Sequence, residues 1–497
     1  MKRKAKKQPI SAPSTVDPRL AVESYRPLLT PAEYELLTSE VDQPLLPAVR
    51  LNPLKTGADF VEHLHSKYGW TLEPLSYCPS GYRVITGRGP DVSSVLEHKL
   101  GMFYIQEAAS MLPVELFTID PGKESICLDL AASPGGKTTH LISRLSDRGL
   151  VIANDSSQGR IPALRIVLQN WGAVACAVTR FPGESFGAWF PETFDRVLLD
   201  APCSMQGLRI AESHALRPVT VKESTQLSVR QSALLTSALQ AVKVGGEVVY
   251  STCTLLPAED EGVVDGIIKQ FGSSVQLLDA QTILPVPAPG IQRGEETVYS
   301  PEMKKTIRLW PHRYHTAGFF ACILQKTGQL DLPVSRPPSH EMEKAGFMEM
   351  TGAQENAFGN RFHEIFGYDL LAYLSGEQRV LVRRDQKFFL FPSILLEKFR
   401  DLPVQSAGLV LGEDTPEGFL PSQEWISRFG AMCQRGTLTL DETESRKWLA
   451  GENLELHPSK DYGRQKFVII RNQDGQAMGC GKVTAKAIKN LLPRRLI

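Results

Sequence analysis

The chain has 497 residues, with 55 lysine and arginine side chains against 55 aspartate and glutamate side chains. That length exceeds what one ordinary core organises, so we expect two to four domains. Hydrophobic residues make up 42% and charged residues 22% of the chain, which excludes a wholly disordered protein. A net charge of zero neither indicates nor excludes a nucleic-acid partner, because binding depends on a local basic patch.

Eight cysteines are spread along the chain. None forms a C-x-x-C pair and no group of cysteine and histidine has zinc spacing, so we expect no metal. We find no secretory signal and no run of about 18 apolar residues that could span a bilayer. We therefore expect a soluble, cytoplasmic protein with reduced thiols and no membrane partner. In such a protein a cysteine is either catalytic or, more commonly, a buried inert thiol.

The amino-terminal part begins with a basic arm, residues 1–18, in which five of the first seven residues are lysine or arginine. We expect this arm to be disordered, as a solvated tail or as a contact to RNA. Residues 19–115 mix helical patterns with strand-like pieces such as Pro47–Asn52, which predicts a small α+β domain. The segment Glu97–Leu116 is expected to be largely helical.

Between residues 116 and 326, short apolar runs alternate with helical stretches near 137–146, 159–171 and 224–243. The predicted strands are Ile126–Leu130, Leu150–Ala153, Arg196–Leu199, Glu247–Tyr250, Thr306–Leu309 and Gly318–Leu324. This alternation predicts an α/β, Rossmann-like domain with a mainly parallel sheet. We expect Gly245 and Gly246 to end the last helix before its strand. Ligands of such sheets bind at the carboxyl ends of the strands.

The carboxyl-terminal part is expected to hold a linker (327–353), a subdomain (354–435) and a final domain (436–497). From Arg464 to the end there are eight basic residues and one acid, Asp474. This local excess favours phosphate contacts over the alternative of a solvated basic face.

The first strand of the α/β domain runs into the loop Asp129–Thr138, which is rich in small residues. A nucleotide-binding P-loop needs G-x-x-x-x-G-K-[ST], and Gly136, Lys137 and Thr138 fit it. Ala131, however, stands where the first glycine of that motif is required. The alternative, which we favour, is the cofactor-binding loop of a methyltransferase; an NTP-binding protein stays open at this point. Asp155 ends the second strand, where an acid can bind ribose hydroxyls.

Two further strands end in cysteine motifs, Asp200–Ser204 and Tyr250–Thr254. Strands that end in Cys203 and Cys253 and lie side by side in one sheet would turn both thiols toward one pocket. A single cysteine would by default be a core residue. Two cysteines at matched strand ends, each among polar neighbours, are hard to explain by packing.

With these motifs the sequence resembles the NOL1/NOP2/Sun family of RNA cytosine-C5 methyltransferases over residues 20–326. Further matches are Arg50-Leu51-Asn52, Gly101–Pro113 and Pro311-His312. The carboxyl-terminal Gly479–Lys482 and Lys489–Arg494 look like the bacterial 16S ribosomal RNA branch of that family. The resemblance implies a class I methyltransferase domain at 116–326, an RNA-binding domain at 19–115 and a PUA-like RNA-binding domain at 436–497.

The resemblance also implies roles for single residues. Cys253 would be the nucleophile that adds to cytosine C6, Cys203 would assist release, and Asp200 would sit between cofactor and base and supply a proton or hydrogen bond near N3. Asp155 would bind the ribose of S-adenosylmethionine, together with a loop comprising Ala131, Ala132, Ser133, Pro134, Gly135, Gly136 and Lys137. The expected partner is 16S ribosomal RNA or the 30S subunit, bound by a monomer. A transfer-RNA enzyme and a non-catalytic assembly factor remain alternatives, and DNA methylation is disfavoured.

Three positions depart from the family pattern. Met205 follows Pro-Cys-Ser where glycine is usual, Pro182 stands where the third strand often ends in an acid, and the acidic run is Glu259-Asp260-Glu261 instead of Glu-Asn-Glu. Pro182 affects an expected cofactor contact and Met205 the shape of the base pocket. Neither change removes a catalytic group.

Overall fold

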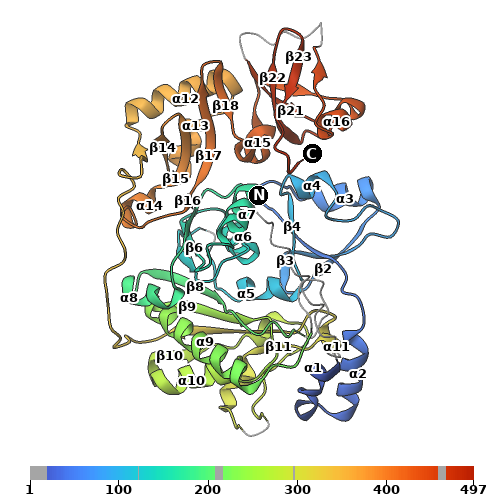
Figure 1. Ribbon diagram of the computed structural model, residues 1–497, viewed down its shortest axis with the longest axis vertical. Helices are drawn as coiled ribbons and strands as arrows, with labels where there is room; N and C mark the ends of the chain where they lie inside the picture. Colours follow the sequence, from blue (N-terminus) through green and yellow to red (C-terminus); the bar gives the residue numbers. More distant parts are fainter. Residues whose placement is uncertain (1–18, 121, 208–215, 295–296, 457–465, 497) are drawn as a thin grey trace, which may run out of the picture.

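The computed structural model describes residues 19–120, 122–207, 216–294, 297–456 and 466–496, so the predicted basic arm lies outside the described residues. Four sheets follow one another through this part of the chain (Figure 1). In these ranges no helix combines the length and the apolar character that crossing a membrane requires.

The amino-terminal region contains an antiparallel four-stranded sheet in the order β2-β3-β1-β4. Its elements are α1 (Arg19–Glu23), α2 (Pro31–Val41), β1 (Ala48–Leu51), α3 (Phe60–Tyr68), β2 (Thr71–Leu75), β3 (Cys78–Ile85), α4 (Leu96–Lys99), β4 (Phe103–Ile105) and α5 (Leu112–Glu115). The prediction that residues 97–116 are largely helical is confirmed at the two ends of this range, at α4 and from residue 109 through α5, and is wrong in the middle. β4 pairs there with β1, Val49 opposite Ile105, and a partner so distant in sequence leaves no local signal.

The central sheet has nine strands and is mixed. Its strands are β5 (Ile126–Asp129), β6 (Leu150–Asn154), β7 (Cys176–Thr179), β8 (Phe194–Asp200), β9 (Val242–Thr252), β10 (Val275–Leu277), β11 (Ile307–Leu309), β12 (Phe319–Lys326) and β16 (Ser406–Ala407). β9, β8, β5, β6 and β7 are parallel neighbours in that order, and the flanking strands pair antiparallel. The expected α/β fold is confirmed, with its parallel part confined to the five central strands.

Helices cover both faces of this sheet. Successive side chains of a strand point to opposite faces, and because both sets are apolar here, both faces are packed against helices. Leu128 of β5 belongs to the core beneath α8 (Phe186–Trp189), α9 (Val221–Ala241) and α10 (Glu261–Phe271). Its neighbour Cys127 belongs to the opposite core, which contains α5, α6 (Gly136–Arg144) and α7 (Ile161–Trp171). The carboxyl ends of the parallel strands are left open between the two layers.

The junction between α9 and β9 differs from the prediction. The helix ends at Ala241 and the strand begins at Val242, so Gly245 and Gly246 lie inside β9. The pairing with β8 shifts register between Phe194 and Arg196, next to this glycine pair. Gly245 has a φ of +86°, which suits a bulge and not a helix end.

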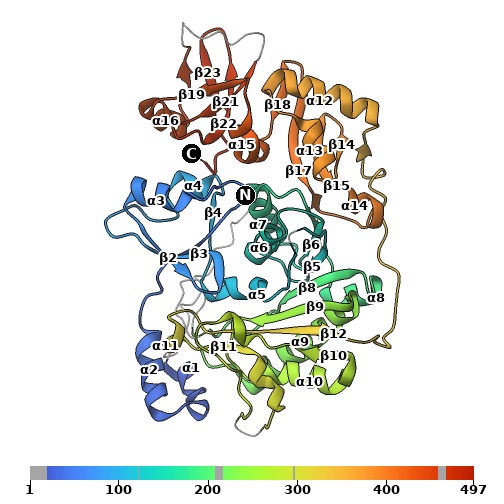
Figure 2. The same cartoon turned by 180° about the vertical axis from the view of Figure 1, so that it is seen from behind.

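The carboxyl-terminal part forms two five-stranded sheets (Figure 2). The first contains β13 (Met348–Glu349), β14 (Arg379–Arg384), β15 (Lys387–Pro392), β17 (Leu409–Thr415) and β18 (Gly418–Pro421), with α12 (Gly352–Phe366), α13 (Leu370–Gly376), α14 (Ser393–Lys398) and α15 (Gln423–Phe429). The second contains β19 (Thr437–Thr439), β20 (Leu454–Glu455), β21 (Phe467–Arg471), β22 (Ala477–Val483) and β23 (Ala487–Asn490), with α16 (Glu442–Leu449). β13 lies within the range expected as a linker.

Both carboxyl-terminal sheets are attached to the rest of the molecule. β16 extends the central sheet beyond β7, and Arg428 of α15 pairs with the buried Asp147. The last sheet lies over α3 and α4 (Figure 2), where Gln476 donates to Glu97 (3.1 Å) and Lys67 pairs with Asp474 (2.9 Å).

Candidate active site

The two cysteines predicted from the strand ends lie in contact. β8 and β9 are adjacent, and the Sγ atoms of Cys203 and Cys253 are 3.1 Å apart. Both side chains are partly exposed, whereas the other six cysteines are buried. Contact with Cys203 lowers the pKa of Cys253, helped by Lys137 and opposed by burial and Asp200. The same contact, together with burial, raises the pKa of Cys203.

Asp200, at the end of β8, is held from two sides. Lys137 of α6 donates to its Oδ2 (2.8 Å) and Ser251 of β9 donates to its Oδ1 (2.8 Å). Lys137 also donates to Ser110 (2.7 Å) and lies 5.2 Å from the ring centroid of Phe319. The pair therefore presents one fixed ammonium and one fixed carboxylate next to the thiols.

A cavity of about 210 Å³ opens at the carboxyl ends of the strands. Seven of the predicted residues line it: Ala131, Ala132, Ser133, Pro134, Gly136, Lys137 and Asp200. Two predicted cofactor residues do not. Gly135 supports the loop from behind with a φ of +113°, where an added Cβ would lie 3.0 Å from Val167. The buried carboxylate of Asp155 accepts from the backbone N–H groups of Ser157 (2.8 Å) and Ser133 (3.3 Å).

The chemistry of this cavity fits S-adenosylmethionine. Asp129 lines it, is 1% exposed, and has one oxygen, Oδ1, with no hydrogen-bond partner. Its other oxygen accepts from Thr138 (2.6 Å). A buried carboxylate oxygen needs a donor, and the ammonium of the methionine part of the cofactor supplies one. The first turn of α6, which begins at Gly136, suits the carboxylate of the cofactor.

The amino-terminal region completes the cavity, which the sequence reasoning missed. Tyr104, Ile105, Gln106, Glu107 and Ser110 line it opposite the loop. This segment is part of the family resemblance, but no local sequence pattern assigns it a role. Burial raises the pKa of Glu107, which accepts from the N–H groups of Ala317 (2.9 Å) and Ser110 (3.1 Å).

The structure gives a backbone reason for the usual glycine after Pro-Cys-Ser. Met205 has a φ of +59°, the left-handed region that favours glycine, and its side chain is 41% exposed. Pro182, the second departure, does not line the cavity. The loop after β7 is instead held by Asn154, whose amide exchanges two 3.0 Å hydrogen bonds with the backbone of Phe181.

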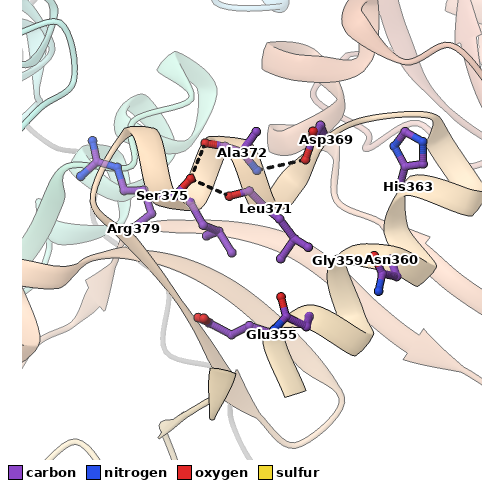
Figure 3. Close-up of a pocket in the computed structure, with 11 residues that line it drawn as sticks. Glu355, Gly359, Asn360, His363, Asp369, Leu371, Ala372, Ser375 and Arg379 are labelled. Atoms are coloured by element: carbon purple, nitrogen blue, oxygen red, sulfur yellow. Dashed lines mark hydrogen bonds between the residues drawn. The ribbon is translucent and has the colours of Figure 1, made fainter. Parts of the chain in front are cut away.

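A larger hollow, about 760 Å³, lies between α12 and α13 (Figure 3). Its lining includes Glu355, Asn360, His363 and Asp369, but none of the predicted site residues. Asp369 accepts from the N–H of Ala372 as a helix cap (Figure 3). We do not assign catalysis to it, because the hydroxyl of Ser375 in its lining donates to the backbone carbonyls of Leu371 and Ala372.

The fold also assembles a group that sequence spacing did not reveal. Cys78, Glu115 and His140 lie close enough to share a metal ion. Glu115 and His140 are already hydrogen-bonded (2.8 Å), and Glu115 also pairs with Arg144 (3.3 Å). Burial and the nearby Arg50 lower the pKa of His140 to about 4. A buried arginine beside the group disfavours a cation, so we assign no metal to it.

Comparison with known proteins identifies the family of the chain, with family models that match three parts of it. Residues 116–325 match the family model for 16S rRNA methyltransferase RsmB/F. Residues 18–108 match the N-terminal domain of 16S rRNA methyltransferase RsmF, and residues 435–497 match the methyltransferase RsmF PUA domain. The expected PUA domain at the carboxyl end is thereby confirmed.

Individual relatives agree with the family models. Ribosomal RNA small subunit methyltransferase F of Shewanella sp. (strain ANA-3) is 32% identical over 92% of each chain. Its counterpart in Aeromonas salmonicida (strain A449) is 30% identical over 92% of this chain and 91% of its own.

Among solved structures, a methyltransferase homolog protein from Pyrococcus horikoshii has a TM-score of 0.55 at 29% identity, covering 63% of this chain and 99% of its own. NSun6 from the same organism has a TM-score of 0.53 at 20% identity, over 63% and 98%, which supports the fold. The chain therefore belongs to the RsmF family of 16S rRNA methyltransferases.

Proposed function

We propose that this protein uses S-adenosylmethionine to methylate carbon 5 of a cytosine in 16S ribosomal RNA. The observation that carries the proposal is the contact of the Cys203 and Cys253 thiols, 3.1 Å apart, beside the Lys137–Asp200 pair. Relatives named as small-subunit ribosomal RNA methyltransferases support this RNA over transfer RNA. We further propose that the enzyme acts in the cytoplasm as a monomer, on 16S ribosomal RNA free or in the 30S subunit.

Cys253 is the nucleophile in this proposal. C5 of cytosine is a poor nucleophile, and addition of a thiolate to C6 breaks the conjugation of the ring and loads negative charge onto C5. S-adenosylmethionine supplies the electrophilic methyl group. The lowered pKa of Cys253, caused first by its contact with Cys203, favours the thiolate that this step needs.

Asp200 and Lys137 act on the edge of the base. Addition at C6 spreads negative charge to N3 and O2, so a proton or hydrogen bond must be supplied there. The ammonium of Lys137, shared with Asp200 at 2.8 Å, and the carboxylate of Asp200, fixed by Ser251, form that donor and acceptor pair. We assign the pair to this role, with Asp200 between the base and the cofactor cavity that it lines.

Cys203 assists the end of the reaction. After methyl transfer an ordered water, acting as the base, takes the proton from C5; the electron pair of that C–H bond then forms the C5–C6 double bond as the bond between Cys253 and C6 breaks. The thiol of Cys203 has a raised pKa, caused by its contact with Cys253 and by burial, and it lies against the sulfur that must depart. A protonated thiol in this place can give its proton to the leaving thiolate.

Ala131 to Lys137, with Asp129, would hold the methionine part of the cofactor. Asp155 would bind the ribose from the rim of the same loop. The target base must be unpaired or flipped out to reach the thiols. The amino-terminal region, which lines the cavity with Tyr104 to Ser110, and the PUA domain would bind the surrounding RNA.

The test uses purified wild-type, Cys253→Ala and Cys203→Ala proteins, each incubated with S-adenosylmethionine and 16S RNA, 30S subunits or transfer RNA. Mass spectrometry and position mapping detect 5-methylcytosine. A covalent RNA adduct that survives denaturation should accumulate with Cys203→Ala and be absent with Cys253→Ala. Wild-type protein that makes no 5-methylcytosine in any of these RNAs overturns the proposal.

A further inference from the structure

Three consecutive acids, Glu259, Asp260 and Glu261, lie between the strand end that carries Cys253 and helix α10. All three side chains are fully buried. Burying three neighbouring carboxylates is costly unless each has partners. Their partners include groups of the two loops that carry the thiols, together with Gln231, Arg308 and the backbone of Ile291.

Glu259 holds the loop of Cys203 on both sides of that cysteine. Its Oε2 accepts from the backbone N–H of Ser204 (2.9 Å) and from Nε2 of the buried Gln231 (3.0 Å). The same Nε2 of Gln231 donates to the backbone carbonyl of Pro202 (2.9 Å). The residue after Cys203 is therefore bonded directly to this carboxylate oxygen, and the residue before it is linked to the same oxygen through Gln231.

Asp260 and Arg308 hold Cys253 in the same way. Thr252, before the cysteine, donates through Oγ1 to Asp260 Oδ1 (2.6 Å). Leu255, two residues after it, accepts at its carbonyl from Arg308 Nη1 (2.7 Å). Arg308 is fully buried on β11 and also donates to Asp260 Oδ2 (3.3 Å), so it closes the network around this loop.

Two links tie the loops to each other. Ser204 Oγ donates to Thr254 Oγ1 (3.0 Å), which joins the residues that directly follow the two cysteines. Glu261 accepts from Arg308 and from the N–H of Ile291 (2.9 Å), which anchors the arginine. Glu259 binds the loop of Cys203 and Asp260 binds the loop of Cys253. Because these two acids are adjacent in the chain, they hold the two loops at a fixed distance from each other.

We propose that Glu259 and Asp260, with Arg308, are positioning residues that set the distance between the two thiols, each acid acting on a different one. The catalytic role of this spacing rests on the proposed function. The positions of the thiols can be tested without it, by thiol labelling and disulfide formation. Displacing a reacting group by about 1 Å costs up to about 100-fold in rate.

The experiment compares Glu259→Ala with Glu259→Gln, and Asp260→Ala with Asp260→Asn, in the full chain. The glutamine and asparagine variants keep an acceptor oxygen, and asparagine is usual at this place in the family that the sequence resembles. Glu247→Ala is the matched control. Glu247 is a buried acid in the middle of β9, the strand that ends just before Cys253, where it accepts from the N–H of Thr118 (2.9 Å).

The first readout is the rate at which iodoacetamide labels each thiol between pH 6 and pH 9, mapped by peptide mass spectrometry. We expect Asp260→Ala to change the labelling of Cys253 about tenfold more than that of Cys203, and Glu259→Ala to do the reverse. The second readout is the rate of Cys203–Cys253 disulfide formation with diamide, which should fall about tenfold in both alanine variants. The conservative variants and Glu247→Ala should stay within about twofold of wild type in both readouts.

Alanine variants that change both thiols equally, or neither, overturn the proposal, as do conservative variants that change the thiols as much as the alanine variants do. If methylation is measurable, kcat should fall in the alanine variants while KM stays near its wild-type value. If the alanine variants change the labelling selectively but the wild-type protein methylates no cytosine, the proposed function is wrong and the positioning role is supported. If the wild-type protein methylates cytosine but the alanine variants change the labelling of both thiols equally, the positioning role is wrong and the proposed function is supported.

Discussion

Replacing Asp129 by asparagine should stabilise the protein and weaken its binding of the cofactor. Asp129 is 1% exposed, Oδ1 has no partner, and burial raises the pKa of the side chain to about 7. Thr138 opposes that shift through its hydrogen bond, and Asp200 adds to it. An uncharged asparagine keeps an acceptor for Thr138 and avoids the buried charge. It therefore removes a free-energy cost that is present only while the aspartate is ionised.

The magnitude follows from the pKa. A rise from 3.8 to about 7 is about 3 units, and each unit corresponds to about 1.4 kcal/mol, so ionised Asp129 costs up to about 4 kcal/mol. For an acid with a raised pKa, the neutral form is favoured, so the cost is absent near pH 4, grows as pH rises, and is complete above about pH 7. The cofactor ammonium offsets it, and a charged hydrogen bond of about 1.5–3 kcal/mol predicts roughly 10- to 100-fold weaker binding to the variant.

The assay measures thermal unfolding of both proteins between pH 4 and pH 8, with and without S-adenosylmethionine, and binding by calorimetry. Without cofactor, Asp129→Asn should unfold at a higher temperature than wild type at pH 8 and at the same temperature near pH 4. With saturating cofactor the advantage should shrink, because ligand binding stabilises the wild type more. A difference independent of pH, or equal cofactor affinity, would refute the reasoning. Asp155→Asn, which loses amide contacts to a buried carboxylate, is the control that should gain no stability.

Three further predictions follow from other contacts. Met205→Gly should raise the free energy of unfolding by up to about 1 kcal/mol in urea, whereas Met205→Ala, which keeps the left-handed strain, should not; a loss of stability in the glycine variant would show that the methionine side chain contributes packing. Arg428→Ala should cost about 3–5 kcal/mol, seen as a lower thermal midpoint, because it leaves the buried Asp147 charge with backbone N–H donors but without its cation; an unchanged midpoint would contradict the stabilising role of this ion pair. Diamide, which takes up two protons and two electrons, should form a disulfide only between Cys203 and Cys253, which dithiothreitol reverses, and mixed disulfides elsewhere would contradict the thiol contact.

The sequence allowed the chemistry at the strand ends to be predicted because that chemistry follows from local pattern. Once apolar runs and helical stretches alternate, the carboxyl ends of the strands meet at one edge, and Lys137, Asp200, Cys203 and Cys253 must gather there. Their contact is therefore a consequence of topology, which the order β5-β8-β9 confirms.

What could not be predicted depends on contacts between distant segments. β4 looked helical because its strand character comes from pairing with β1. Arg308 lies in β11 and donates to the carbonyl of Leu255, more than 50 residues earlier in the chain. Nothing in the sequence of β11 indicates this contact. The unpaired oxygen of Asp129 is a property of the cavity and not of the motif. Each of these features depends on packing between distant segments, which produces no periodic pattern in the sequence.

The short strand β16 has a consequence for the order in which the molecule is made. Ser406 and Ala407 cover the edge of β7, opposite Val178 and Ala177, and Phe391, Leu395 and Phe399 enter the same core as β8. A ribosome finishes the methyltransferase part at about residue 326, but the edge of its sheet stays bare until residue 407 has emerged. During that interval the nascent chain exposes an unpaired strand, the feature that invites aggregation. A fragment ending near residue 326 would carry that exposed edge permanently, so a minimal enzyme should be cut after β16 and not before it.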